Sequence, residues 1–448
     1  MTLDATVALL TWFRRHLSRV WGNEAGNTAI MLGLCLLPTI GLIGLGVDYW
    51  SGLSNKARLD AAADSAALAA ITAAQAYYNA NIQTQPDPAL TSGAKAAGEA
   101  QGYKAFPVNA GAAVTRTSAT PTINVTRKGQ SFTAAVSYKA KLPTAFGKLF
   151  GTTNFNIGGS SGSSLTMGSY LDFYLLLDVS GSMGLATSPQ GQTALADLNP
   201  DASGCAFACH FAGMKSYDAA KKKHITLRVN SVASAVTNLI STATSTQTLT
   251  HQYRVGIYPF IVNLMEAAPI SYNFTQATAT ANSLADSYLD QGLSNPATTA
   301  MGSGGTHFEN VLPGINNYVK SPGGDGSSPQ KAKTFLFIVT DGADDNQVYY
   351  GNGNWSGPQP QRPNNFGYCQ YAQQLGVTIS ILYIPYVPIQ PARAGEDTQV
   401  NAVIPFIPDD LKACATPGFF FTANSDADIN NAMQAMFAQA LQAARLTN

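Results

Sequence analysis

The feature that most constrains this chain is an uncharged apolar run of 23 residues between Glu24 and Asp48, AGNTAIMLGLCLLPTIGLIGLGV. A helix of this length spans the hydrocarbon core of a bilayer. The run has no polar face, which argues against a helix buried in a soluble core. Asp48 follows it directly, where a cleaved signal would place small residues. We therefore predict an uncleaved transmembrane helix over residues 25–47.

Charge around this run predicts its orientation. Arg14, Arg15 and Arg19 precede it, so the positive-inside tendency places residues 1–24 in the cytoplasm and the remainder outside. Over the whole chain, 26 Lys and Arg balance 26 Asp and Glu. The chain therefore has no net positive charge that would attract nucleic acid, so a dedicated DNA or RNA binder is excluded as the main hypothesis.

Composition changes along the chain predict its organisation. Residues 48–83 are alanine-rich and lack Gly and Pro over 59–80, which predicts a helical stalk that continues the membrane helix and invites close packing or self-association. Residues 84–168 begin with a proline-containing break. Short runs rich in Thr and Val follow, which predict a small antiparallel β unit. The Gly- and Ser-rich stretch GGSSGSSLTMGS is then predicted to be a flexible connection into residues 169–448.

Strands and helices alternate from Tyr170 onward. Strands are predicted at 171–177, 254–261, 334–340, 377–384 and 418–422, and helices at 214–243, 307–319, 366–375 and 426–444. Such alternation predicts an α/β fold of Rossmann type, with a mostly parallel sheet flanked by helices. Three long connections, 184–212, 263–305 and 385–417, are predicted to be insertions.

Polar side chains follow two of these strands. DVSGSMG places Asp178, Ser180 and Ser182 after the first strand, and FLFIVTDG places Asp341 after the third. GSGGTHFEN offers Thr306 ahead of a helix. Because ligands of open parallel sheets sit at the carboxyl ends of strands, we expect these five residues to form one all-oxygen site. Oxygen ligands suit a hard divalent cation, Mg²⁺ first, with Ca²⁺ or Mn²⁺ as alternatives.

Structural explanations for the same residues stay open. Thr306 and Glu309 fit a T-x-x-E capping box, and Asp341 with Gly342 fits a simple turn. Asp344, Asp345 and Asn346 fit an exposed acidic loop better than a further cation site. Neither Ser180 nor Ser182 stands in a G-x-S-x-G elbow, and no G-x-x-x-x-G-K-[ST] phosphate-binding loop is present, so no catalytic residue is predicted.

Four cysteines lie beyond the membrane run: Cys205, Cys209, Cys369 and Cys414. An even number in an exported region predicts two disulfides with three alternative pairings. We favour Cys205 with Cys209 and Cys369 with Cys414.

The order D-x-S-x-S, then Thr after a Gly-rich turn, then T-D-G resembles the metal-ion-dependent adhesion site, or MIDAS, of von Willebrand factor type A (VWA) domains. The resemblance covers residues 169–448 and implies a VWA domain with insertions. It implies that Ser180, Ser182 and Thr306 supply hydroxyl ligands. Asp178 and Asp341 would bind directly or through water, and an acidic side chain of a protein partner would complete the shell.

The sequence GNTAIMLGLCLLPTIGLIGLGVDYWSGLSNKARLDAAADSAALAA resembles the anchor of TadG-type proteins, which assist assembly of Flp (Tad) pili in bacteria. The resemblance implies a single-pass protein of the bacterial inner membrane with its bulk in the periplasm, near pilus or pilus-assembly components. Glu24 precedes the apolar run and no glutamate lies within it, so prepilin-type cleavage is not supported.

These observations predict a membrane-anchored pilus-assembly or adhesion-type protein that is not an enzyme and binds a protein partner through its cation. Two alternatives remain: a metal-assisted hydrolase acting on cell-envelope material, and a passive structural tether.

Overall fold

The computed structural model describes residues 24–82, 84–201, 203–210, 214–290, 305–344, 348–349, 355–356, 362–363, 366–386 and 396–446. The chain divides into two compact units, Met1–Thr166 and Met167–Asn448. The cytoplasmic segment predicted for residues 1–24 lies almost entirely outside the described residues.

The first unit is built on one long helix, α2 (Glu24–Asn81), which contains both the predicted membrane span and the predicted stalk. Within the described residues, this helix alone is long and apolar enough to cross a membrane. Its first half exposes large apolar side chains, among them Leu37 at 75% and Leu42 at 72%. Its second half buries an alanine stripe, which includes Ala62, Ala66 and Ala70.

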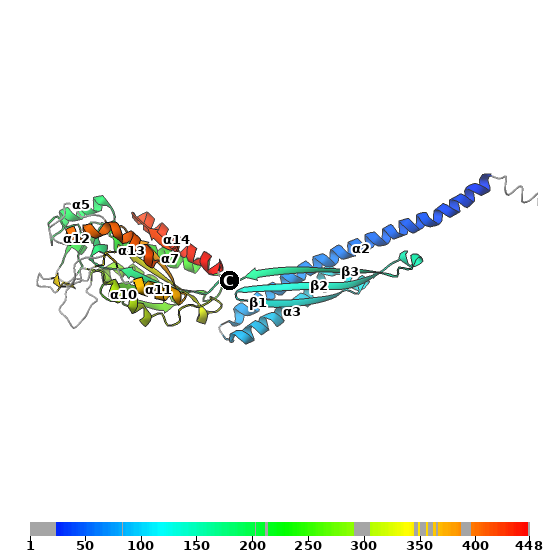
Figure 1. Ribbon diagram of the computed structural model, residues 1–448, viewed down its shortest axis with the longest axis horizontal. Helices are drawn as coiled ribbons and strands as arrows, with labels where there is room; N and C mark the ends of the chain where they lie inside the picture. The colour runs from blue at the N-terminus through cyan, green and yellow to red at the C-terminus, as the bar shows by residue number, and fades with distance from the viewer. Residues whose placement is uncertain are drawn as a thin grey trace, which may run out of the picture. The chain divides into compact units, whose positions relative to one another are not determined.

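That stripe is covered by a second helix and a sheet. Helix α3 (Asp87–Ala110) is followed by α4 (Ala112–Thr117). Strands β1 (Thr120–Lys128), β2 (Ser131–Pro143) and β3 (Asn154–Thr166) then form an antiparallel sheet in the order β1-β2-β3. Most of the Gly- and Ser-rich stretch predicted to be a flexible connection is part of β3 instead, because it pairs with β2 along its length. Figure 1 shows α2 and α3 running along this sheet.

Helix α3 was not predicted, because residues 84–168 were interpreted as β-rich. Its sequence signal is a small or apolar residue at nearly every fourth position, which places Ala94, Gly98 and Gly102 on the buried face. A Cβ at Gly98 would lie 2.7 Å from the carbonyl oxygen of Ala70. The glycine therefore lets α3 approach α2 closely, so the alanine-rich helix is one layer of a packed unit rather than a free stalk.

The second unit contains the six-stranded sheet, in the order β11-β10-β7-β4-β5-β6. Its strands are β4 (Leu171–Asp178), β5 (Tyr253–Phe260), β6 (Ala268–Ser271), β7 (Lys333–Thr340), β10 (Thr378–Tyr383) and β11 (Phe420–Thr422). All neighbouring pairs are parallel except β5 with β6. Counted along the chain, this is the doubly wound order 3-2-1-4-5-6. The predicted α/β class is confirmed, and the antiparallel edge strand β6 was not among the predicted strands.

A separate two-stranded antiparallel sheet pairs β8 (Val348–Tyr349) with β9 (Trp355–Ser356).

Helices cover both faces of this sheet. The described helices are α5 (Pro189–Leu198), α6 (Ser216–Lys222), α7 (Arg228–Thr246), α8 (Phe274–Asn282), α9 (Leu284–Tyr288), α10 (Phe308–Gly314), α11 (Phe366–Gln374), α12 (Glu396–Val403), α13 (Ile407–Cys414) and α14 (Asp426–Leu446). Along β4, Phe173 and Leu175 pack into the core beneath α7 and α14. Tyr174 and Leu176 pack into the other core, beneath α10, α11 and α13. This alternation explains why β4 is a continuous apolar run.

One predicted helix is broken in two. The run 214–243 forms α6 and α7, and the turn between them contains His224 with a φ of 56°. The break makes Arg228 the first residue of α7, and this position matters for the site described below.

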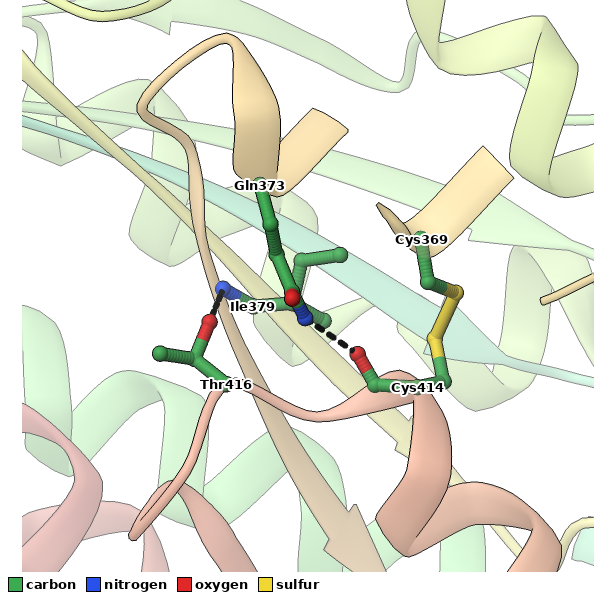
Figure 2. Close-up of a disulfide and its surroundings, with 5 residues drawn as sticks. All are labelled: Cys369, Gln373, Ile379, Cys414 and Thr416. Carbon is green, nitrogen blue, oxygen red and sulfur yellow. Dashed lines mark hydrogen bonds between the residues drawn. A yellow bond between two sulfur atoms is a disulfide. The ribbon is translucent and has the colours of Figure 1, made fainter. Parts of the chain in front are cut away.

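One of the two predicted disulfides is formed. Cys369 on α11 is bonded to Cys414 at the end of α13. Beside it, the amide of Gln373 donates to the carbonyl of Cys414 at 2.9 Å, and Thr416 Oγ1 accepts from the backbone N–H of Ile379 (Figure 2). The bond thus ties α11 and α13 together at the flank of β10.

The predicted Cys205–Cys209 disulfide is not formed, and both residues carry free thiols. The backbone between them is held elsewhere: Phe207 forms a bridge with Leu185, and the N–H of Ala208 donates to Gly184 at 3.0 Å. These hydrogen bonds fix the segment along the loop after β4 instead of letting it close on itself.

Candidate functional site: an all-oxygen cluster at the ends of β4 and β7

The five predicted site residues come together at the carboxyl end of the second unit's sheet. Strands β4 and β7 are parallel neighbours with Leu177 opposite Val339, so the residues that follow them emerge side by side. Asp178 ends β4 and Asp341 comes directly after β7. Asp178, Ser180, Thr306 and Asp341 are each at most 2% exposed.

Asp178 is held by its own loop. The backbone N–H of Ser180 donates to Asp178 Oδ1 at 3.0 Å. The Ser180 hydroxyl lies 3.1 Å from the hydroxyl of Ser182. A carboxylate that accepts from the loop that follows it fixes that loop, and here it brings both serine hydroxyls to the carboxylate.

Thr306 arrives from a distant part of the chain. Its hydroxyl lies 3.2 Å from Asp178 Oδ2 and 3.3 Å from Ser180 Oγ. Two backbone contacts position it: Thr306 forms a parallel bridge with Asp344, and the next N–H, of His307, donates to Ile261 at 3.0 Å. The segment before α10 is therefore anchored to the ends of both β5 and β7.

Asp341 completes the cluster from β7. It accepts a hydrogen bond from the hydroxyl of Ser182. Its Oδ2 also accepts from Arg228 Nη1 at 3.0 Å, and Arg228 Nη2 donates to the carbonyl of Pro385 at 2.8 Å. The side chain of Arg228 is 3% exposed, so this is a buried ion pair.

The cluster carries more acidic than basic charge. Burial raises the pKa of Asp341, and repulsion from Asp178 raises it further, while Arg228 and Ser182 act in the opposite direction. Burial also raises the pKa of Asp178, although the hydroxyls of Ser180, Thr340 and Thr306 favour its ionised form. A cation between the two carboxyl groups would favour their ionised forms and offset the repulsion between them.

Three residues of the site were missed by sequence reasoning. Thr340 Oγ1 donates to Asp178 Oδ2 at 2.6 Å and accepts from the N–H of Gly342 at 2.9 Å. Its place in the T-D-G stretch was an available signal. Arg228 gave no signal, because it lies 113 positions from Asp341 in the sequence.

Asp290 is the third missed residue. Its N–H donates to the carbonyl of Val179 at 2.8 Å, and its carboxyl lies over the loop, 3.5 Å from where a Cβ of Gly181 would be. The side chain is buried, and this burial raises the pKa of Asp290 to about 8. The cluster thus has a third acidic group at its border.

Two structural explanations from the sequence are wrong. The T-x-x-E capping box is not formed, because the N-cap of α10 is His307 and Glu309 instead pairs with the His307 ring at 3.0 Å. Asp344 is not part of an exposed loop. It is 1% exposed, and its Oδ1 accepts from the N–H of Phe308 at 3.4 Å. Asp345 and Asn346 lie outside the described residues.

The donor set suits a hard cation. Two carboxylates and three hydroxyls offer only oxygen, the ligand type that Mg²⁺, Ca²⁺ and Mn²⁺ take. Within the described ranges, no three His, Cys, Asp or Glu side chains gather in a way that could hold a metal. Any cation at this site would therefore depend on the hydroxyls.

The strand order, the helices on both faces and the polar cluster at the carboxyl ends of β4 and β7 define the second unit as a doubly wound α/β fold, the class that the resemblance to VWA domains predicted. Residues 26–76 match the family described as "Putative Flp pilus-assembly TadE/G-like". This match confirms the resemblance of the amino-terminal segment to TadG-type anchors.

The solved structures that match this chain do so at low sequence identity and low TM-score. Proximal thread matrix protein 1 from the mussel byssus is 15% identical, with a TM-score of 0.35, over 61% of this chain and 49% of that one. BatB from Bacteroides thetaiotaomicron is 14% identical, with a TM-score of 0.34, over 61% of this chain and 99% of BatB. The pilus adhesin SpaC from Lactobacillus rhamnosus GG is 12% identical, with a TM-score of 0.34, over 72% of this chain and 34% of SpaC. This chain therefore spans about half the length of the first of these. No curated protein matches the sequence.

Proposed function

We propose that this protein is a membrane-anchored pilus-assembly or adhesion-type protein that binds a protein partner through a divalent cation held at the β4 and β7 strand ends. The observation that carries the proposal is the convergence of five oxygen-bearing side chains. They come from three separate segments and surround a buried position lined by two carboxyl groups and three hydroxyls.

The first unit supplies the anchor in this proposal. Leu37 and Leu42 belong to an apolar helix face that nothing in the described part of the chain covers, which is expected if lipid covers it. Arg14, Arg15 and Arg19 precede the helix, which favours a cytoplasmic amino terminus and a periplasmic bulk at the bacterial inner membrane. The TadE/G-like match over residues 26–76 supports a role with pilus components.

The second unit supplies the cation site. Ser180, Ser182 and Thr306 would hold Mg²⁺ through their hydroxyls, and Asp178 and Asp341 would bind it directly or through water. A bound cation would supply an open coordination position for an acidic side chain of the partner. Thr340 donates a hydrogen bond to Asp178, and Arg228 donates one to Asp341. These bonds hold the two carboxylates in place without Thr340 or Arg228 being a ligand.

Binding rather than catalysis fits the surroundings of the site. The imidazole of His307, the residue after Thr306, is buried and paired with Glu309. Arg228 is occupied by Asp341 and Pro385. These groups hold the site together, so we propose no general base and no reaction.

Cation binding is tested on the full chain in detergent by calorimetric titration with Mg²⁺ and Mn²⁺. The wild type should bind one equivalent in the second unit, and Asp178→Asn should bind none. Asp172→Asn is the matched control, since Asp172 is a buried carboxylate on the same strand, paired with Arg254 at the strand's other end. Equal binding by Asp178→Asn and wild type would refute the site.

The partner is tested by measuring capture of purified pilus subunits on the reconstituted protein. Capture should require Mg²⁺, disappear with chelator and disappear in Asp178→Asn. Capture that is equally strong with and without chelator would favour the alternative that the protein is a passive structural tether. Turnover of generic ester or phosphate substrates that Asp178→Asn abolishes would favour the hydrolase.

A further inference from the structure

A loop of the first unit lies against the predicted membrane span. Between β2 and β3 the chain forms a tip, residues 146–150 with the sequence FGKLF, which includes a 3₁₀ turn over Gly147–Phe150. Turns between strands that face water are usually rich in Gly, Asn, Asp and Ser. This tip instead carries two phenylalanines and a leucine, and Leu149 is 74% and Phe150 57% exposed.

The tip packs on glycines of helix α2. A Cβ at Gly41 would lie 2.6 Å from the Phe150 ring, and one at Gly44 would collide with the Phe146 ring. Gly41 and Gly44 are buried, whereas Leu42 and Ile43 beside them are exposed. Small residues on one helix face permit such close approach inside membranes.

Asp48 fixes this arrangement. Its carboxylate accepts three backbone hydrogen bonds from the start of the tip, from Ala145 at 2.9 Å, Phe146 at 2.9 Å and Gly147 at 2.8 Å. Gly41 lies seven positions before Asp48, which is about 10 Å along a helix. Phe150 is therefore held at the depth of the apolar run, below the first charged residue that follows it.

We propose that this tip is a second membrane contact, with Leu149 and Phe150 inserted into the leaflet beside the anchor helix. The inference depends on the membrane anchor proposed above. The occupant is lipid, because the helix face next to the tip is itself apolar and exposed, with Leu42 at 72% and Ile43 at 64%. Lys148 lies within the tip and is exposed, so its ammonium group can reach anionic headgroups.

Such a tip would fix the first unit on the bilayer. A single helix leaves a domain free to tilt and rotate about its point of exit. An inserted apolar loop, joined to that helix by Asp48, removes this freedom at the membrane surface. The sheet of β1, β2 and β3 would then stand on the bilayer in one orientation.

The test places a photoreactive benzophenone side chain at position 149 of the full chain, reconstituted in phosphatidylethanolamine and phosphatidylglycerol vesicles. Mass spectrometry then detects lipid adducts. Leu42 is the positive control within the span. Val108 is the matched control, an apolar residue on α3 of the same unit that is 79% exposed. The yield at position 149 should approach that at 42 and exceed that at 108 about tenfold.

Each outcome decides one proposal. Lipid adducts at 42 but only background at 149 would overturn the inserted tip and leave the anchor intact. Background yields at 42 as well as at 149 would overturn the anchor itself. Adducts at 149 with protein instead of lipid would also overturn the tip, because they would assign it to a protein interface.

Discussion

Arg228 and Asp341 form a buried ion pair at 3.0 Å that joins the first turn of α7 to the end of β7. The guanidinium also lies over the Tyr386 ring and donates to Pro385, so it connects α7 to the segment after β10 as well. One side chain thereby holds three elements around the proposed cation site.

Replacing this arginine should destabilise the second unit. Arg228→Met leaves Asp341 buried beside Asp178 without a counter-charge, which typically costs about 3–5 kcal/mol. Mg²⁺ should restore more stability in the variant than in the wild type, because the ion replaces the missing charge. Urea unfolding with and without Mg²⁺ measures both effects. Lys221→Gln removes an exposed ion pair with Asp286 and should cost at most about 1 kcal/mol. An equally small loss in Arg228→Met would contradict the prediction.

Thr340 should act on cation affinity without being a ligand. Thr340→Val keeps the shape but removes the donor to Asp178 Oδ2, and changes of this kind around a ligand lower metal affinity by about 10- to 100-fold. Titration with Mn²⁺ gives the affinity. Thr242→Val alters a half-buried threonine whose hydroxyl donates to the carbonyl of Asn238 within α7, and it should leave the affinity unchanged. Wild-type affinity in Thr340→Val would show that this hydrogen bond does not position Asp178.

Asp290 should make stability depend on pH. Burial raises its pKa from 3.8 unfolded to about 8 folded, so the folded state holds the proton more tightly. Its contribution is fully present below about pH 4 and is lost as pH rises through 8, with a slope of up to about 1.4 kcal/mol per pH unit. Asp290→Asn should flatten this part of the profile, measured by urea unfolding in Mg²⁺-free buffer from pH 4 to 8. Identical slopes in the two proteins would refute the assignment.

The bond between Cys369 and Cys414 should be the only disulfide that the five cysteines form. Three of the five cysteines, Cys35, Cys205 and Cys209, are free, so alkylation of the unfolded, unreduced protein should modify three sites. Cys369 and Cys414 close a loop of 45 positions, and replacing both by Ser should cost about 2–5 kcal/mol. The double variant Cys205→Ser with Cys209→Ser is the control and should change stability little. A single modified site in the alkylation experiment would indicate a second disulfide.

The strand ends explain why most of the site could be predicted. Side chains that follow parallel strands meet at one edge whatever lies between them, so Asp178 and Asp341 could be placed together from pattern alone. Thr306 was found through its glycine-rich turn. Asp344 was misjudged, because its burial depends on a bridge to Thr306 that has no local sequence signal.

By itself, the sequence determined the features that follow from local pattern. The length of an apolar run specifies a helix able to span a membrane, and alternation of strands and helices specifies a parallel sheet. Only the tertiary structure decided the contacts between distant positions. Among these are Arg228 with Asp341 at a separation of 113 residues, Thr340 with Asp178 at 162, and the tip over Gly41 and Gly44. The physical reason is that periodicity reports which face a residue takes, whereas a buried partner is chosen by packing across the whole fold.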